Sequence, residues 1–112
     1  MQISQNVNND VLVLSLEGDL MGGADSEKFR KVVDQAIEEE QTNIIVDMSH
    51  VSWMNSAGLG MLISALTSLR SSGGDLRLAN LNDRLRRPLQ ITKLDSVFQE
   101  YETVESAIKS YQ

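Results

Sequence analysis

Short apolar runs alternate with longer stretches of helical periodicity along this chain, and this alternation constrains the fold more than any other feature. Residues 11–16, 43–47 and 75–79 have the length and the apolar or alternating character of β-strands. Between them, apolar residues recur at helical spacing over about 26–40 and again over about 56–71. Strands separated by helices require right-handed crossovers and a largely parallel sheet. The pattern therefore predicts an α/β domain.

The N-terminal segment is expected to add an antiparallel hairpin to this sheet. Residues 2–7 form a plausible short strand, and Asn8-Asn9-Asp10 is a turn signal. The strands on either side of that turn would pair as a hairpin, which makes the sheet mixed. Met21-Gly22-Gly23 is a break in the pattern, after which Asp25 or Ser26 is the expected cap of the first helix.

The last third of the chain is expected to hold two more helices and a short edge strand. Asn82 or Asp83 can cap the first of these helices, and Pro88 within it predicts a kink or a late start, because proline lacks an N–H donor. The apolar face of that helix would be formed by Leu85, Leu89 and Ile91. A short edge strand is expected at residues 97–98, followed by a last helix capped by Thr103.

Composition favours one soluble domain that binds proteins. The length of 112 residues predicts a single domain over residues 1–112, with a four- to five-stranded mixed sheet, an N-terminal β-hairpin and about four helices. Cysteine is absent, which excludes disulfides and thiolate metal sites. No apolar run approaches a membrane span and the N-terminus has no secretory pattern, so a cytoplasmic location is expected. A net charge of −6 and an aromatic content of 4% argue against nucleic-acid binding.

The stretch WMNSAGLG, residues 53–60, raises the question of what Ser56 does. A serine nucleophile needs a hydrogen-bonded base, and the one histidine, His50, lies in the same loop. The stretch also lacks the leading glycine of the G-x-S-x-G elbow. We therefore expect no enzyme activity, and His50 is expected to be an exposed loop residue.

Phosphate and metal sites have little support in the sequence. No lysine follows the serine, and Gly58-Leu59-Gly60 lies inside the expected helix, whereas the glycines of phosphate loops precede one. Four scattered aspartates have no spacing that points at one ion, and they are Asp10, Asp19, Asp25 and Asp47. No cofactor or metal is expected.

The remaining interpretation makes Ser56 the cap of a helix whose start is a binding surface. Its hydroxyl would accept a hydrogen bond from the N–H of residue 58 or 59. Three small residues, Ala57, Gly58 and Gly60, would leave the solvent side of the first turn almost bare. Met61 and Ser64 would continue that face opposite the leucine stripe, and methionine suits adaptable interfaces. A phosphate on Ser56 would be tolerated by the helix end but would obstruct a partner packed there.

Four stretches give the chain a resemblance to the STAS domain family, in particular to its single-domain bacterial anti-sigma factor antagonists. Residues 45–60 are similar to the family pattern of an apolar strand, D-[LM]-S, a few mixed residues and D-S-[AS]-G-[LI]-G. Residues 16–20, LEGDL, are similar to L-x-G-[DE]-[LI]. Residues 93–98 and 103–107 resemble the C-terminal signature of the family.

The resemblance implies a non-enzymatic regulator of transcription that works by partner switching. It implies that the unphosphorylated form binds an anti-sigma factor serine kinase and frees a sigma factor, that phosphorylation of Ser56 switches it off, and that a serine phosphatase restores it. Asn55 stands where the family usually has aspartate, and Met21 stands where it often has aspartate. The partner-binding residues implied are Asp19, Met54, Asn55, Ser56, Ala57, Gly58, Gly60, Met61 and Ser64.

Other functions remain open at this point. The chain could be a constitutive STAS scaffold or a transporter-associated subunit in which Ser56 is only a cap, or a module that binds a nucleotide at the same helix end. It could be a monomer or a weak dimer. The basic cluster of Arg84, Arg86 and Arg87 could meet an acidic partner or a phosphate, or could be a solvated face.

Overall fold

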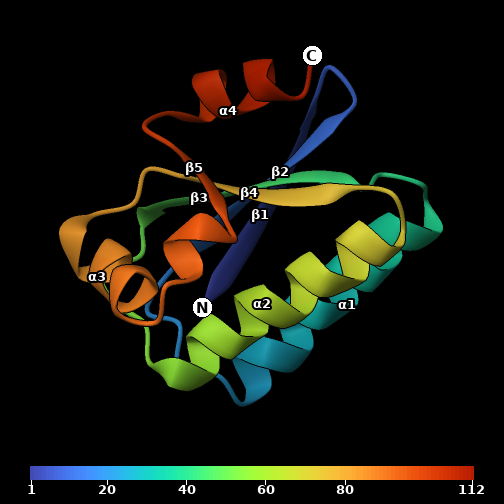
Figure 1. The fold of residues 1–112 in the computed structure, drawn as a ribbon. Helices are drawn as coiled ribbons and strands as arrows, with labels where there is room; N and C mark the ends of the chain where they lie inside the picture. The colour runs from blue at the N-terminus through green and yellow to red at the C-terminus, as the bar shows by residue number, and fades with distance from the viewer.

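The computed structural model describes all 112 residues, which form one five-stranded sheet with helices on both faces (Figure 1). The strands lie in the order of the chain: β1 (Gln2–Asn8), β2 (Val11–Glu17), β3 (Asn43–His50), β4 (Asp75–Ala79) and β5 (Gln99–Tyr101). β1 pairs antiparallel with β2, and every other pair of neighbours is parallel. The predicted mixed sheet with an N-terminal hairpin is confirmed.

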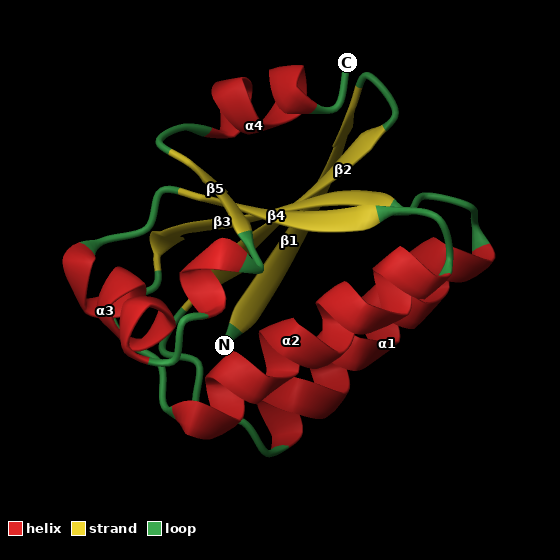
Figure 2. Ribbon diagram, viewed as in Figure 1, coloured by secondary structure: helices red, strands yellow, loops and turns green.

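Four α-helices cover the sheet: α1 (Ala24–Glu38), α2 (Ser56–Ser71), α3 (Asp83–Ile91) and α4 (Val104–Ser110). The first three each connect two neighbouring parallel strands, so right-handed crossovers bring them to the same face. Figure 2 shows α1, α2 and α3 on one face of the sheet and α4 alone on the other. No helix combines the length and the apolarity needed to cross a bilayer.

Two apolar clusters hold these layers together, one on each face of the sheet. Alternate residues of β2 serve both: Leu12, Leu14 and Leu16 join the large cluster under α1 to α3, whereas Val11 and Val13 join the small cluster under α4. β2 therefore carries the near-continuous apolar run typical of a strand that is covered on both faces.

Several expected boundaries are corrected by contacts that the sequence pattern does not reveal. α1 is preceded by Gly23, which has a positive φ of 63° and no capping side chain, so the expected cap at Asp25 or Ser26 is wrong. Val97 and Phe98 donate to the carbonyl of Leu94 in a tight turn, so the last strand begins only at Gln99.

The helix that contains Pro88, α3, begins at Asp83, directly after its expected cap. Asn82 caps α3, because its Oδ1 accepts from the N–H of Leu85 at 2.9 Å, and Pro88 lies inside the helix without delaying its start. Leu85 and Leu89 are buried as expected, but Ile91 is 70% exposed, so its expected place on the buried face is wrong. The cap of α4 by Thr103 is confirmed, with Oγ1 accepting from the N–H of Ser106.

Candidate functional site

The start of α2 is held in place by the segment that follows β2. Leu20 and Met54 form an isolated parallel bridge beyond the ends of β2 and β3. The N–H of Leu20 donates to the carbonyl of Trp53, and the N–H of Asn55 donates to the carbonyl of Leu20, both at 3.1 Å. This bridge fixes the residue at which the chain leaves the sheet and enters the helix.

Asn55, and not Ser56, caps α2. Asn55 has the extended backbone of an N-cap residue, and its Oδ1 accepts from the N–H of Gly58 at 2.8 Å. Its Nδ2 also donates to the carbonyl of Met21 at 3.1 Å, so one amide joins the helix start to the segment after β2. The predicted cap by Ser56 is wrong, because Ser56 is the first residue inside the helix and is exposed. Its hydroxyl is not needed to hold the helix end.

The two glycines in the first turns of α2 have different surroundings. Gly58 is buried, and a Cβ at that position would overlap the carbonyl oxygen of Leu20. A Cβ on Gly60 would meet nothing within 4 Å, and Gly60 is exposed. Gly58 therefore serves close packing inside the molecule, so its predicted exposure is wrong, whereas Gly60 leaves the surface bare as predicted.

Met54 and Met61 are also inside, with exposed fractions of 3% and 7%. Both belong to the large apolar cluster. α1 and α2 run side by side in Figure 1, so α2 is covered by α1 as well as by the sheet and buries more than its leucine stripe. The predicted exposed position of Met61 is therefore wrong. A groove of about 360 Å³ lies between the two helices, with Phe29, Met61 and Ser64 among its lining residues.

The exposed remainder of the predicted surface is a narrow row of small residues. Ser56, Gly60 and Ser64 are exposed and follow one another at four-residue spacing, which puts them on one side of α2. Ala57 is exposed beside them, and Gly22, with a φ of 82°, lies close against its Cβ. We call Ser56, Ala57, Gly60 and Ser64 the α2 stripe. Asp19 is exposed separately, in the segment after β2.

The other polar residues near this loop serve structural roles. The carboxylate of Asp47 accepts from the side chain of Asn80 at 2.9 Å and from the N–H of Ser49 at 3.1 Å. The ring of His50 contacts the hydroxyl of Ser49 at 3.2 Å and is exposed, as expected. His50 is the last residue of β3, so its expected place in a loop is wrong, although its expected exposure is confirmed.

The segment at residues 20–22 is the part of the site that sequence reasoning missed. Its contributions are a backbone carbonyl from Met21, a paired backbone from Leu20 and a close approach by Gly22. None of these depends on a side chain with recognisable chemistry. The only available signal was the Gly22-Gly23 pair, which indicates a backbone that needs unusual freedom.

Fold and site together define a small mixed-sheet domain in which small residues leave one side of the start of α2 exposed. A model of the STAS domain family matches residues 2–107, and the chain belongs to this family.

Several relatives of the chain are named anti-sigma factor antagonists. A Thermotoga neapolitana protein, provisionally named an anti-sigma factor antagonist, is 33% identical over 85 residues, which are 75% of each chain. The anti-sigma F factor antagonist of Paenibacillus polymyxa is 25% identical over 109 residues, 96% of this chain and 92% of its own. The solved structure of the Bacillus cell fate determinant SpoIIAA in its phosphorylated form superposes with a TM-score of 0.77 at 25% identity, covering 99% of this chain and 100% of that one.

Proposed function

We propose that this chain is an anti-sigma factor antagonist that binds an anti-sigma factor through the α2 stripe and thereby frees a sigma factor. The relatives named above support this role, and the stripe supports the place of binding. A row of serine, alanine and glycine allows a partner backbone or side chain to approach the helix closely. In this proposal the chain is a non-catalytic binding protein, and its partner is a serine kinase that acts on it.

The observation that supports regulation by phosphorylation is that Asn55 and Ser56 have separate roles: Asn55 caps the helix, and Ser56 is exposed. Because Asn55 caps the helix, the exposed hydroxyl of Ser56 is free to accept a phosphate without loss of the cap. A phosphate there would sit at the positive end of the α2 dipole, which favours an anion. It would also add about −1.5 to −2 charges in the middle of the binding surface, and a partner packed on the stripe would have to desolvate them.

The neutral Asn55 is compatible with this proposal. Its amide donates to the carbonyl of Met21, which an ionised aspartate could not do. The place of a carboxylate beside the phosphate acceptor is therefore taken by a group that holds the segment after β2 against the helix. Asp19, exposed in that segment, is proposed as a further contact for the partner.

The proposal is tested with the purified anti-sigma factors encoded by the genome that encodes this chain. Wild type and Ser56→Ala should bind one of them, whereas Ser56→Asp should bind it about 100-fold more weakly or worse, because a charge is then buried without a partner. The melting temperature of Ser56→Asp should stay close to that of the wild type, because Ser56 is exposed and caps nothing.

Phosphorylation is tested in the same mixture by adding ATP and measuring intact mass. The expected result is one phosphate on the wild type, none on Ser56→Ala, and its removal by a serine phosphatase. Normal binding by Ser56→Asp would contradict the switch. Tight binding without any phosphorylation would favour a constitutive scaffold.

A further inference from the structure

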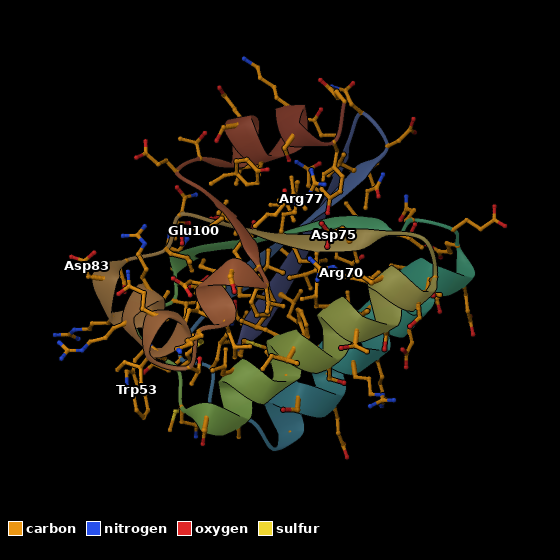
Figure 3. All side chains as sticks on the ribbon, viewed as in Figure 1. Trp53, Arg70, Asp75, Arg77, Asp83 and Glu100 are labelled. Carbon is orange, nitrogen blue, oxygen red and sulfur yellow. The ribbon has the colours of Figure 1, made fainter.

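A second exposed surface lies between the loop before α2 and helix α3. A hollow of about 470 Å³ is lined by Trp53, Arg84, Arg87, Pro88 and Ile91, which we call the Trp53–α3 surface. Trp53 is 44% exposed and Ile91 is 70% exposed, and both are among the few large apolar side chains that remain in solvent. Figure 3 shows Trp53 projecting from the loop beside α3 and the start of α2.

The basic cluster on α3 is divided between internal and free groups. Arg86 pairs with Glu100 and with Asp83, the latter at 3.1 Å, and its hydrogen bond to Glu100 raises its pKa. Arg84 and Arg87 have no carboxylate within salt-bridge distance, although the chain carries 16 acidic residues against 10 basic ones. The two guanidinium groups on this surface are therefore free to meet a charge on another molecule.

This surface is physically tied to the start of α2. The side-chain amide of Asn82, the cap of α3, donates to the carbonyl of Val51 at 3.2 Å. Val51 and Trp53 belong to the same short connection that leads from β3 to Ser56. A partner that reaches Ser56 therefore has the Trp53–α3 surface beside it.

We infer that the Trp53–α3 surface docks an acidic segment of the anti-sigma factor that carries an apolar side chain, an inference that rests on the proposed function. Tryptophan and arginine are the residues that most often dominate binding energy at interfaces. The apolar side chain would lie on Trp53, Pro88 and Ile91, and its acidic neighbours would pair with Arg84 and Arg87. A nucleic acid fits less well, because the chain as a whole carries −6 and would repel a polyanion.

The test uses single charge reversals and one truncation, measured with the anti-sigma factor that binds the wild type. Arg84→Glu, Arg87→Glu and Trp53→Ala should each weaken binding about tenfold or more. Lys109→Glu is the matched control, since it makes the same charge change at an exposed position on α4, across the sheet, and should leave affinity within about twofold. Circular dichroism and melting curves of each variant establish that the fold is intact.

Two further measurements identify the occupant. Trp53 is the only tryptophan of this chain, so the emission change on binding that is present in the wild type and lost in Trp53→Ala reports whether this surface is covered. Replacing an acidic residue of the partner with lysine should restore binding to Arg84→Glu or Arg87→Glu. Full binding by all three variants, together with unchanged Trp53 fluorescence when the wild type is saturated with the partner, would overturn the inference and leave the proposed function standing.

The remaining outcomes are equally decisive. If the wild type binds none of the anti-sigma factors, the proposed function fails and this inference fails with it. If a DNA duplex changes Trp53 fluorescence in the wild type but not in Arg84→Glu, the surface belongs to a nucleic acid and the inference is overturned.

Discussion

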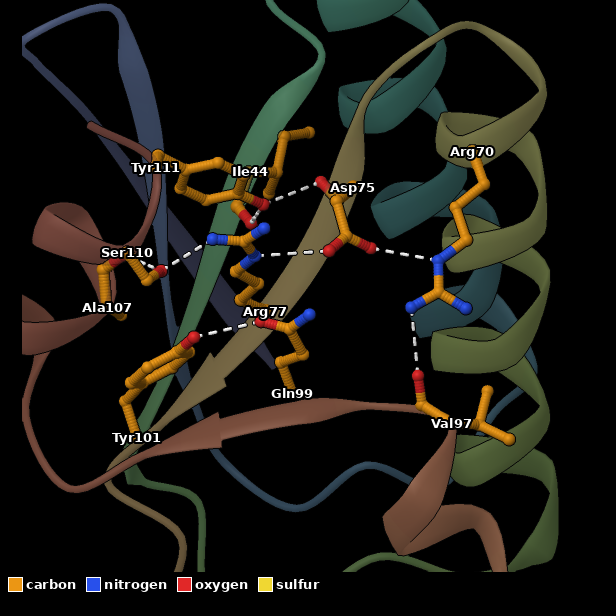
Figure 4. Close-up of polar contacts among 10 residues, drawn as sticks. All are labelled: Ile44, Arg70, Asp75, Arg77, Val97, Gln99, Tyr101, Ala107, Ser110 and Tyr111. Atoms are coloured by element: carbon orange, nitrogen blue, oxygen red, sulfur yellow. Dashed lines mark hydrogen bonds and ion pairs between the residues drawn. The ribbon is translucent and has the colours of Figure 1, made fainter.

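Two regions of this domain, around α4 and at the start of α2, are held together by different kinds of contact. Between β4 and its neighbours, polar side chains pair with one another: Asp75 lies between Arg70 at the end of α2 and Arg77 of β4, at 3.0 and 3.1 Å (Figure 4). Arg77 also donates to Ser110 at 2.7 Å, and its guanidinium stacks on the ring of Tyr111. At the start of α2, by contrast, the chain is held by backbone bonds, close approaches of glycine and one amide.

This difference separates stability from binding. The polar groups of the network at α4 are paired with one another. They therefore hold the short helix α4 on the sheet and leave few polar groups for a partner. The start of α2 needs no charged side chain for its own structure, so its hydroxyl and its bare surface remain available. Substitutions at the first end should change the free energy of unfolding, and exposed substitutions at the second should change binding.

Gly58 lies at the start of α2 but is buried, so a substitution there should change stability. A single added methyl group at this position should have the largest effect. In Gly58→Ala the new Cβ would overlap the Leu20 carbonyl, which is fixed by its bond to Asn55. The expected loss is about 3 kcal/mol of unfolding free energy, from overpacking and from displacement of the segment after β2. Urea unfolding measures this directly.

The matched control is Gly60→Ala, two residues further along the same helix. Its Cβ enters open space, so it should stabilise the domain by up to about 1 kcal/mol through helix propensity. The same methyl group lies on the α2 stripe and should weaken partner binding. Equal stability of the two variants would contradict the distinction between the two glycines.

Tyr111 tests the α4 end, with a smaller effect. Its hydroxyl lies 2.8 Å from the carbonyl oxygen of Ile44 and 2.9 Å from that of Asp75, so Tyr111→Phe should cost about 1–2 kcal/mol at neutral pH. Arg77→Ala should also weaken this end, and neither variant should alter binding at Ser56. A loss of partner affinity in Tyr111→Phe would break the separation of the two regions.

The contacts of Tyr111 should also make the free energy of unfolding depend on pH. Burial raises the pKa of its hydroxyl, with a further contribution from the nearby Asp75 carboxylate. The folded state therefore favours the neutral phenol, whose contribution is fully present below the ordinary tyrosine pKa of about 10 and is lost as the pH rises above it. The fall in stability above about pH 10 should be smaller in Tyr111→Phe, as measured by urea unfolding across that range.

The fold was predictable because most of its signals are local. The spacing of apolar residues and the turn residues indicate the hairpin, the alternation of strands and helices, and the cap at Thr103. Each of these signals depends on a few neighbouring residues. The site was less predictable because long-range contacts decide it. Asn55 and Ser56 are both good capping residues, and the bridge between Leu20 and Met54 sets which of them stands at the helix boundary.

The burial of Met61 on α2 and the pairing of Arg86 on α3 do not follow from the sequence, for the same reason. The periodicity of α2 indicates one apolar stripe but not that α1 lies along a second side, so the burial of Met61 cannot be predicted from it. The three arginines of α3 are alike in sequence, and only the return of the chain at Glu100 distinguishes Arg86 from the other two. Side-chain chemistry could be read from the sequence, but the partners of those side chains could not.

The smallest expected effect is at Asn55, where the two roles of one amide can be separated. Asn55→Asp keeps an oxygen that accepts from Gly58 and gains a favourable interaction with the helix dipole, but it loses the donor to Met21. The two changes oppose each other, so the free energy of unfolding should change by less than about 1 kcal/mol. Asn55→Ala loses both contacts and should cost about 1–2 kcal/mol.

Amide hydrogen exchange should show faster opening of residues 20–23 in both variants, but a weakened start of α2 only in Asn55→Ala. Unchanged exchange at residues 20–23 in Asn55→Asp would mean that the backbone bridge holds that segment without the amide.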